Sequence, residues 1–419
     1  MGRKVDKKTY VLLQYDCSER GLCITECDDG SVVYEDDSTE SYKSWGLSYD
    51  EIYHELYDTW RNRLRQKHYT LEAYKFERSL GKHLDTLTKR ILDGTWKPSG
   101  YFDFKVYHPS RVISAPYYQD RIVEEWLTER FVKSYLEPKL HPTSVACRVD
   151  KGPPVAKAIV LDTLGEMYRK HGMNFYVFQF DVKGYYDNVN HERIREQFSG
   201  MEELGRILFM NIVDDWKQSD GYAAKEDPNG AYGVPKGNLP SQWIGLSYLN
   251  EMDWMISARI DVEGQVRYMD DGLVFLADKT SCKDLKIKIE EYFRNNKMGI
   301  ILHPKKTRYA PISKGFTFCG WRYELFPDGH VRMREKPERK KVTKKRLEEA
   351  TENFYAGKLS ENDVNAKLNG LQAYLKNGDT KAFLRYLNHR YVFTHDPEQF
   401  SKDRRNEYLR KDRRFKDEK

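Results

Sequence analysis

A nearly continuous apolar segment that ends in an aspartate constrains this chain more than any other feature of its sequence. Residues 175–180 read FYVFQF, and Asp181 follows them directly. Such a run predicts a buried central strand, because a strand that is covered on both faces carries apolar residues on both. Carboxylates do not gather at the ends of such strands for stability, so Asp181 is a candidate functional residue.

Two more aspartates lie at a predicted hairpin turn. The chain is apolar on both sides of Asp270 and Asp271 across residues 265–277, which predicts two strands joined at the acidic pair. Like charges close together repel, so gathered carboxylates persist mainly where a cation compensates them. The pair also fits a plain solvated turn, because Asp271-Gly272 is a common turn pair.

These carboxylates favour one kind of chemistry if they meet. Hard oxygen ligands select Mg²⁺, with Mn²⁺ as the alternative ion. Two ions about 3.5–4 Å apart can activate an attacking hydroxyl and stabilise a departing pyrophosphate, which is what nucleotidyl transfer requires. In this interpretation Asp181 and Asp270 bridge both ions, and Asp271 is a looser third ligand.

Composition sets wider limits on the chain. With 39% apolar and 32% charged residues among 419, it is typical of a globular protein of two or three domains. No apolar run reaches the ~18 residues of a membrane span, and no leader is visible after Met1, so no membrane partner is expected. The six cysteines are dispersed, which favours a reducing cytoplasm over a disulfide framework.

The aspartates belong to a series of motifs in a fixed order. Tyr268-Met269-Asp270-Asp271 has the form Y-x-D-D, and DVKGYYD at 181–187 has the form D-x-x-x-x-[FY]. The others are RVIS at 111–114 with Asp120-Arg121, ACR at 146–148 with Lys151-Gly152, GVPKGNLPSQ at 233–242, LHPKKT at 302–307 and FCGW at 318–321. Over residues 70–395 this series resembles bacterial reverse transcriptases, which are RNA-directed DNA polymerases, of the group II intron, diversity-generating retroelement and phage-defence types.

The resemblance implies an α+β fold of the right-hand polymerase type. Fingers and palm would contain an antiparallel palm sheet packed on helices, and the thumb would be α-helical. The expected domains are an N-terminal appendage at 1–43, fingers at 44–170, palm at 171–333, thumb at 334–400 and a charged tail at 401–419.

The resemblance also implies roles for single residues. Asp181, Asp270 and Asp271 would be the catalytic carboxylates, and with the backbone carbonyl of Val182 they would bind two Mg²⁺ ions. Tyr186 matches the steric gate that favours dNTP over rNTP, although a core tyrosine on a strand is the alternative. Further nucleotide-binding residues are expected at Lys105, Arg111, Lys236, Gln242 and Lys306.

Several of these positions leave alternatives open. Lys105 and Arg111 match fingers residues that hold the triphosphate, but exposed strand charges would look the same. Lys306 matches a lysine thought to protonate the pyrophosphate, and an ordinary surface lysine is the alternative. Lys236 stands where many reverse transcriptases have glutamine and diversity-generating enzymes have an aliphatic residue. It matches neither, so the expected fidelity stays open.

The basic segment after Arg334 fits a thumb that lies against a template–primer duplex. Backbone contacts of this kind are independent of base sequence and weaken with salt, and an RNA–DNA hybrid is recognised by its shape. A solvated helix face is the alternative. The primer grip is expected at Phe318, Cys319, Gly320 and Trp321, and nucleic-acid contacts at Arg148, Lys151, Arg339, Lys340, Lys344 and Lys345.

The expected partners are an RNA template, a DNA primer or product, and dNTPs, and an accessory protein or a homo-oligomer is compatible with the sequence. The leading interpretation is a cytoplasmic prokaryotic enzyme of anti-phage defence that copies its own structured non-coding RNA. A diversity-generating enzyme is the close alternative, because NLPSQ at 238–242 is similar to its N-L-T-S-Q, whereas YYDNV at 185–189 is nearer to intron and defence enzymes. A non-catalytic RNA-binding scaffold on a polymerase fold is the alternative of another class.

Overall fold

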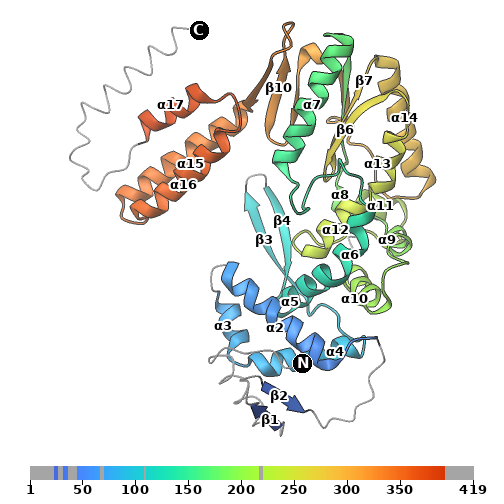
Figure 1. Cartoon of the computed structure of the whole chain (residues 1–419), viewed down its shortest axis with the longest axis vertical. Coiled ribbons are helices and arrows are strands. Elements are labelled where there is room, and N and C mark those ends of the chain that lie inside the picture. Colours follow the sequence, from blue (N-terminus) through green and yellow to red (C-terminus); the bar gives the residue numbers. More distant parts are fainter. Residues whose placement is uncertain are drawn as a thin grey trace. The chain divides into compact units, whose positions relative to one another are not determined.

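The computed structural model describes residues 23–26, 32–35, 45–66, 70–107, 110–216 and 220–391. The described part of the expected N-terminal appendage is an antiparallel pair, β1 (Cys23–Glu26) and β2 (Val32–Glu35). The expected charged tail lies outside the described residues. The chain divides into two compact units, and Figure 1 labels their elements.

The first unit is drawn from Met1–Cys147, Val182–Met255 and Lys288–Leu302, and it is mostly helical. Its earlier elements are α2 (Tyr49–Gln66), α3 (Leu71–Glu77), α4 (Leu80–Leu92), β3 (Tyr101–Tyr107), β4 (Ser110–Pro116), α5 (Tyr118–Leu127), η1 (Thr128–Val132), α6 (Lys133–Leu136) and η2 (Glu137–Lys139). Its later elements are α8 (Tyr185–Asn188), α9 (His191–Gln197), α10 (Glu203–Asp214), α11 (Tyr222–Glu226), α12 (Leu239–Ser247) and most of α13 (Asn250–Ser257).

Helix α4 shows how the sequence builds the core of this unit. Leu84, Leu87 and Ile91 recur at helical spacing, and all three are buried, as the pattern predicts. Gly94, just past the end of the helix, has a φ of 67°, the left-handed conformation that commonly ends helices.

The second unit is drawn from Arg148–Asp181, Ile256–Ile287 and His303–Lys419. Its elements are α7 (Pro153–His171), β5 (Tyr176–Asp181), β6 (Val262–Tyr268), β7 (Asp271–Leu276), the start of α14 (Lys279–Asn295), β8 (Arg308–Pro311), η3 (Ile312–Lys314), β9 (Phe316–Phe318), β10 (Trp321–Leu325), β11 (Val331–Glu335), α15 (Pro337–Tyr355), α16 (Glu361–Leu375) and α17 (Lys381–Arg390).

The main sheet of the second unit is antiparallel, with strand order β6-β7-β5-β8. Its inner strand β5 buries Phe178 and Phe180, which confirms the predicted central strand. Strands β6 and β7 confirm the predicted hairpin. Gly272 lies opposite Phe180, and a Cβ there would collide with the phenylalanine ring. The glycine therefore allows a large ring to pack at the end of the sheet that carries the aspartates.

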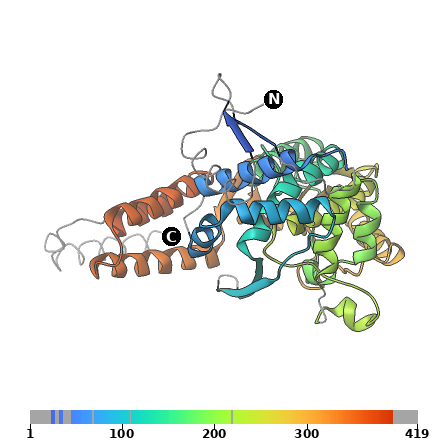
Figure 2. The ribbon, with the colours of Figure 1, turned by 90° about the horizontal axis from the view of Figure 1, so that it is seen from below.

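A second sheet and a group of helices follow the main sheet in the described part of this unit. The strands form a second antiparallel sheet in the order β11-β10-β9. The helices α15, α16 and α17 lie side by side, in orange and red in Figure 2, around a buried cluster of Leu347, Leu375, Leu387 and Tyr391. The predicted helical segment after Arg334 is confirmed, whereas the predicted domain boundaries remain a prediction.

The described residues mix helices with antiparallel sheets, as the predicted α+β class requires. None of the helices among them is both long enough and apolar enough to cross a membrane.

Candidate active site

The predicted acidic turn is a tight hairpin between β6 and β7. Tyr268 pairs with Asp271, which leaves Met269 and Asp270 as the two turn residues. Met269 has a φ of 57°, a left-handed conformation that few non-glycine residues adopt. The guanidinium of the buried Arg267 donates a hydrogen bond of 2.6 Å to the Met269 carbonyl and so supports the turn. Nothing in the Y-x-D-D pattern points to Arg267, because the pattern begins one residue later.

Strand register brings the third aspartate to this turn. Asp181, at the end of β5, lies opposite Asp271, at the start of β7. Burial raises the pKa of Asp271 to about 7, and repulsion from Asp181 and Asp270 adds to the shift. Burial also raises the pKa of Asp270, with repulsion from Asp181 as a further cause. Folding thus brings three carboxylates near enough for their charges to repel, and a cation would relieve that cost.

Lys306 supplies a positive charge at this site. Its Nζ lies 2.9 and 3.1 Å from the two carboxylate oxygens of Asp181. The loop that carries it is fixed to the same residue, because the His303 N–H donates to the Asp181 carbonyl at 2.7 Å. The Thr307 hydroxyl donates to that carbonyl at 3.3 Å. The LHPKKT segment therefore folds around Asp181, and its last lysine neutralises the carboxylate.

A divalent ion suits these donors, although they are not gathered around one point. Among the described residues, no three His, Cys, Asp or Glu side chains form a group that could hold a metal ion as they stand. The candidate side-chain donors are all carboxylate oxygens, which suit Mg²⁺ and Mn²⁺, and their mutual repulsion favours a cation. Lys306 would have to release Asp181 for that carboxylate to bind an ion. Val182, the other expected ligand, forms an isolated antiparallel bridge with Leu302.

The expected steric gate lies on a short helix, not on a strand. Tyr186 is half-buried in α8, and its carbonyl accepts a hydrogen bond of 2.8 Å from the Val234 N–H. The ring of Tyr185 meets the Tyr186 ring edge to face, with centroids 5.5 Å apart. The Tyr185 hydroxyl donates to the carbonyl of Gly245 in α12 at 2.9 Å. The turn that carries Tyr186 is thus fastened to the GVPKGNLPSQ segment through Val234 and to α12 through Gly245.

Lys236 has a partner that its motif does not suggest. Its Nζ lies 2.6 Å from the carboxylate of Asp187, the residue after Tyr186, and both side chains are partly exposed. The structure therefore places the Lys236 ammonium on the turn of the expected gate. Positions 187 and 236 both depart from the pattern of diversity-generating enzymes. This joint departure is the sequence signal from which the ion pair between the two residues could have been predicted.

The two expected triphosphate contacts occupy opposite faces of the β3–β4 hairpin. Lys105 pairs with Val112 and Arg111 pairs with Val106, and both charged residues are exposed. Since cross-strand partners share a face and neighbours along a strand alternate, Lys105 and Arg111 project in opposite directions. Gln242 is exposed on α12.

Arg148 and Lys151 flank a tight turn in the second unit, where the Lys151 N–H donates to the Arg148 carbonyl at 3.3 Å. Asp150, between them, has a φ of 54°. This left-handed residue turns the chain immediately before α7.

Two carboxylates are buried on α5: Asp120, which belongs to the motif series, and Glu124, which does not. Burial raises the pKa of Glu124 to about 8, and repulsion from Asp120 adds to this shift. Burial raises the pKa of Asp120 to about 6, although the Ser99 N–H and hydroxyl both donate to it. Asn238, the N-cap of α12, donates to Glu124 at 3.4 Å. This contact ties α5 to the GVPKGNLPSQ segment within the first unit.

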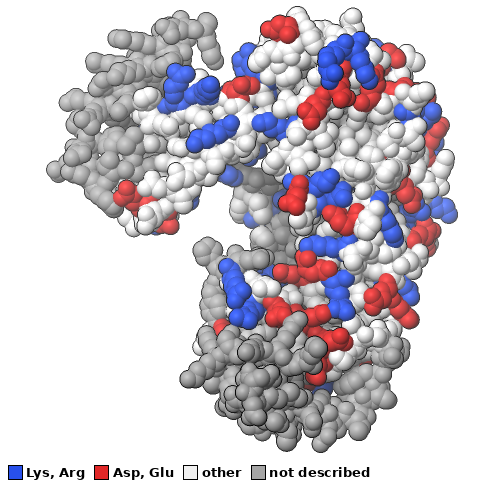
Figure 3. Space-filling view, in the orientation of Figure 1, with Lys and Arg blue, Asp and Glu red and all other residues white. Residues whose placement is uncertain are grey.

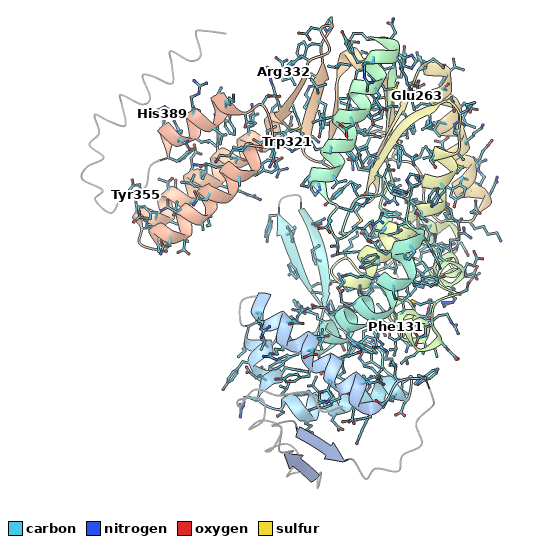
Figure 4. The ribbon with its side chains drawn as sticks, viewed as in Figure 1. Phe131, Glu263, Trp321, Arg332, Tyr355 and His389 are labelled. Atoms are coloured by element: carbon cyan, nitrogen blue, oxygen red, sulfur yellow. The ribbon has the colours of Figure 1, made fainter. Side chains whose placement is uncertain are left out.

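The expected primer grip is a second tight hairpin turn. Phe318 pairs with Trp321 between β9 and β10, and Cys319 and Gly320 form the turn with φ of 45° and 87°. The Trp321 ring stacks on that of Tyr374 in α16, with centroids 4.9 Å apart. Figure 4 shows Trp321 where β10 meets the C-terminal helices. The turn is therefore anchored by aromatic packing.

The expected nucleic-acid contacts on α15 lie over aromatic rings. The distance from the cationic group to the ring centroid is 4.3 Å for Arg339 over Tyr374, 5.3 Å for Lys340 over Phe383 and 4.3 Å for Lys344 over Tyr386. Lys345 points elsewhere, toward Glu349 at 3.7 Å. Figure 3 shows lysine and arginine side chains along these helices and acidic ones at the end of α15 and α16 away from β10.

Comparison with known proteins places these elements in a family. The family model described as reverse transcriptase (RNA-dependent DNA polymerase) matches residues 105–323, which is just over half of the chain. No curated protein matches the chain. Among solved structures it is similar to an apo telomerase from Candida tropicalis, with 14% identity over 74% of this chain and 55% of that chain and a TM-score of 0.40.

A form of the same telomerase truncated from the C-terminal domain gives 18% identity over 54% of this chain and 52% of that chain, with a TM-score of 0.38. The chain spans about half the length of these solved chains.

Proposed function

The chain belongs to the reverse transcriptase family, and on that premise we propose that it is an RNA-directed DNA polymerase, a nucleotidyltransferase. Its α+β fold is that of a right-hand polymerase, as predicted. The observation that carries the proposal is the register that sets Asp181 opposite Asp271, beside Asp270. An RNA-binding scaffold would have no reason to gather three acids whose charges repel.

The carboxylates are proposed to hold two Mg²⁺ ions, with Mn²⁺ as the alternative. Reverse transcriptases generally use divalent metal ions. Asp181 and Asp270 would bind both ions, with Asp271 and the Val182 carbonyl as further ligands. When bound, such ions supply activation of the primer 3′-hydroxyl and stabilisation of the departing pyrophosphate.

Other residues of the chain are proposed to prepare this site. Arg267 supports the turn that presents Asp270, through its hydrogen bond to the Met269 carbonyl. Lys306 neutralises Asp181, because its ammonium lies 2.9 Å from that carboxylate. Once it releases that carboxylate, its ammonium is available to donate a proton to the pyrophosphate, as positive charge near a developing anion favours.

Nucleotide selection is proposed to rest on the first unit. A ring at Tyr186 beneath the sugar would leave no room for a 2′-hydroxyl and would favour dNTP. Lys105 and Arg111 project from opposite faces of their hairpin, so we expect one of them, not both, to contact the triphosphate. Lys236 would act by holding the turn of Tyr186, because Asp187 binds its ammonium.

The helices α15 to α17 are proposed to bind the template–primer duplex as a thumb. Lys345 and the ring-supported Arg339, Lys340 and Lys344 would contact phosphates, and Arg148 and Lys151 would add contacts. The FCGW turn would hold the primer end. Binding of this kind weakens steeply as salt rises.

Primer extension on an RNA template with Mg²⁺ and dNTPs tests the activity. The wild-type chain should incorporate dNTPs, and Asp270→Ala combined with Asp271→Ala should lower incorporation by at least about 10³-fold. Equal incorporation by the purified protein with and without these substitutions would rule the proposal out. RNA binding by a wild-type chain that incorporates nothing would favour the scaffold.

The biological role that we propose is anti-phage defence in the cytoplasm of a prokaryotic cell, by copying an associated structured RNA. The YYDNV segment at 185–189 supports this role, whereas NLPSQ at 238–242 supports a diversity-generating enzyme as the second candidate. Sequencing the nucleic acid that co-purifies with the protein separates the two. A single structured RNA with its cDNA supports defence, and cDNA of a variable protein-coding repeat supports diversification.

A further inference from the structure

One glycine of α12 lies directly against the ring of the expected gate. A Cβ built on Gly245 would lie 2.7 Å from the hydroxyl oxygen of Tyr186, and 3.2 and 3.4 Å from Cζ and Cε1 of that ring. The first of these distances is too short for a real carbon–oxygen contact, so any side chain at position 245 would move the tyrosine. Only glycine allows the ring to rest where it does.

The position of this glycine is unusual for a helix. Gly245 lies inside α12 between Ile244 and Leu246, which are both buried. Glycine inside a helix is unfavourable relative to alanine, so a buried interior glycine commonly marks a close approach of another group. Gly165 in α7 is a useful contrast, because a Cβ built there would meet nothing within 4 Å.

The chain on both sides of the Tyr186 ring is held by hydrogen bonds. Its carbonyl is held by the Val234 N–H at 2.8 Å, and the Tyr185 hydroxyl is held by the Gly245 carbonyl at 2.9 Å. Asp187, the next residue, is held by Lys236 at 2.6 Å. A methyl group at position 245 would therefore displace the half-buried ring away from α12 while the backbone stays in place.

We propose that Gly245 is a specificity-determining residue, because it sets how deeply the Tyr186 ring sits and so how much space remains for the nucleotide sugar. The proposal rests on the proposed function of Tyr186 as the gate. It assigns to α12 a role in sugar selection through a residue that makes no polar contact with the nucleotide.

Kinetics of the full chain with Gly245→Ala test the proposal. Displacement of the ring toward the sugar should raise KM for dNTP about 5- to 10-fold while kcat changes less than about 3-fold, as for lost ground-state fit. In a Tyr186→Phe background the colliding hydroxyl is absent. There the same alanine should change KM by less than about 2-fold. Gly165→Ala is the matched control, and it should leave KM and kcat unchanged.

Thermal unfolding of the wild type, Gly245→Ala, Tyr186→Phe and the double variant gives a readout that needs no polymerase activity. Alanine at position 245 should raise the unfolding temperature about 2–4 °C more in the Tyr186→Phe background than in the wild type. An equal change in unfolding temperature in the two backgrounds, or an equal change in KM, would overturn the proposal.

The variant Tyr186→Ala separates this proposal from the proposed function. If Tyr186→Ala leaves the preference for dNTP over rNTP intact while extension continues, the chain is a polymerase and the role of Gly245 in selectivity is wrong. If the wild type extends no primer at all, the proposed polymerase function is wrong. The unfolding temperatures in the two backgrounds then still show whether Gly245 sets the position of the Tyr186 ring.

Discussion

Two hairpin turns of the second unit share one backbone feature but have different functions. In the acidic turn Met269 has a φ of 57°, and in the FCGW turn Cys319 has a φ of 45°. Each turn thus holds a non-glycine residue in the left-handed region, which is sparsely populated and persists where the surroundings hold it.

Different contacts support the acidic turn and the FCGW turn. The acidic turn is supported by the buried Arg267 and presents carboxylates whose pKa values burial and mutual repulsion raise. The FCGW turn is supported by the stack of Trp321 on Tyr374. The first turn therefore gathers charge at the expense of stability, and the second stabilises the junction with the helices. Substitutions in the acidic turn should therefore lower polymerase activity. Substitutions in the FCGW turn should instead lower the free energy of unfolding.

The largest expected effect on stability comes from the FCGW turn. Trp321 is 5% exposed, so Trp321→Ala removes a buried ring and should lower the free energy of unfolding by about 3–5 kcal/mol. Trp254, which is 48% exposed, is the matched control, and Trp254→Ala should cost less than about 1 kcal/mol. Urea titrations measure both. Equal losses of unfolding free energy in the two variants would contradict the stabilising role of Trp321.

The buried carboxylate of Glu124, in the first unit, tests the cost of burying a carboxylate through the pH dependence of stability. The pKa of Glu124 is raised to about 8 in the folded chain, so the unfolded chain loses its proton first as pH rises. Wild-type stability should therefore fall between about pH 4.5 and pH 8, and Glu124→Gln should remove that part of the fall. The gain from the substitution should reach the order of 1–4 kcal/mol by pH 8. A gain that is the same at pH 5 and pH 8 would contradict this account.

The smallest expected effect concerns the ion pair of Lys236 with Asp187. Both side chains are partly exposed, so the pair should contribute about 0.2–1 kcal/mol. A double-mutant cycle with Lys236→Gln and Asp187→Asn measures this coupling. If Lys236 instead contacts the nucleotide directly, the cycle shows no coupling, and Lys236→Gln alone raises KM for dNTP.

Local patterns of the sequence were enough to predict the strand that ends at Asp181, the hairpin of Asp270 and the C-terminal helices. Each of these rests on apolar periodicity or on a turn signal, which act between near neighbours. The order of the motifs then supplied the family. The catalytic roles assigned to single residues remain predictions.

Contacts between distant segments could not be predicted in the same way. The pairing of Lys306 with Asp181 and of Lys236 with Asp187 depends on how separate loops fold against the aspartate segment. The opposite orientation of Lys105 and Arg111 depends on the register of one hairpin. A shift of one residue in that register would reverse the face of a side chain, and periodicity alone does not determine it.

The most direct test of the central claim pairs activity with stability at the acidic turn. Asp270→Asn combined with Asp271→Asn keeps the shape of both side chains and removes their charge. We predict that primer extension on RNA falls by at least about 10³-fold while the unfolding temperature stays the same or rises, because repulsion is relieved. Undiminished extension, or a loss of extension that accompanies a lower unfolding temperature, would contradict the account.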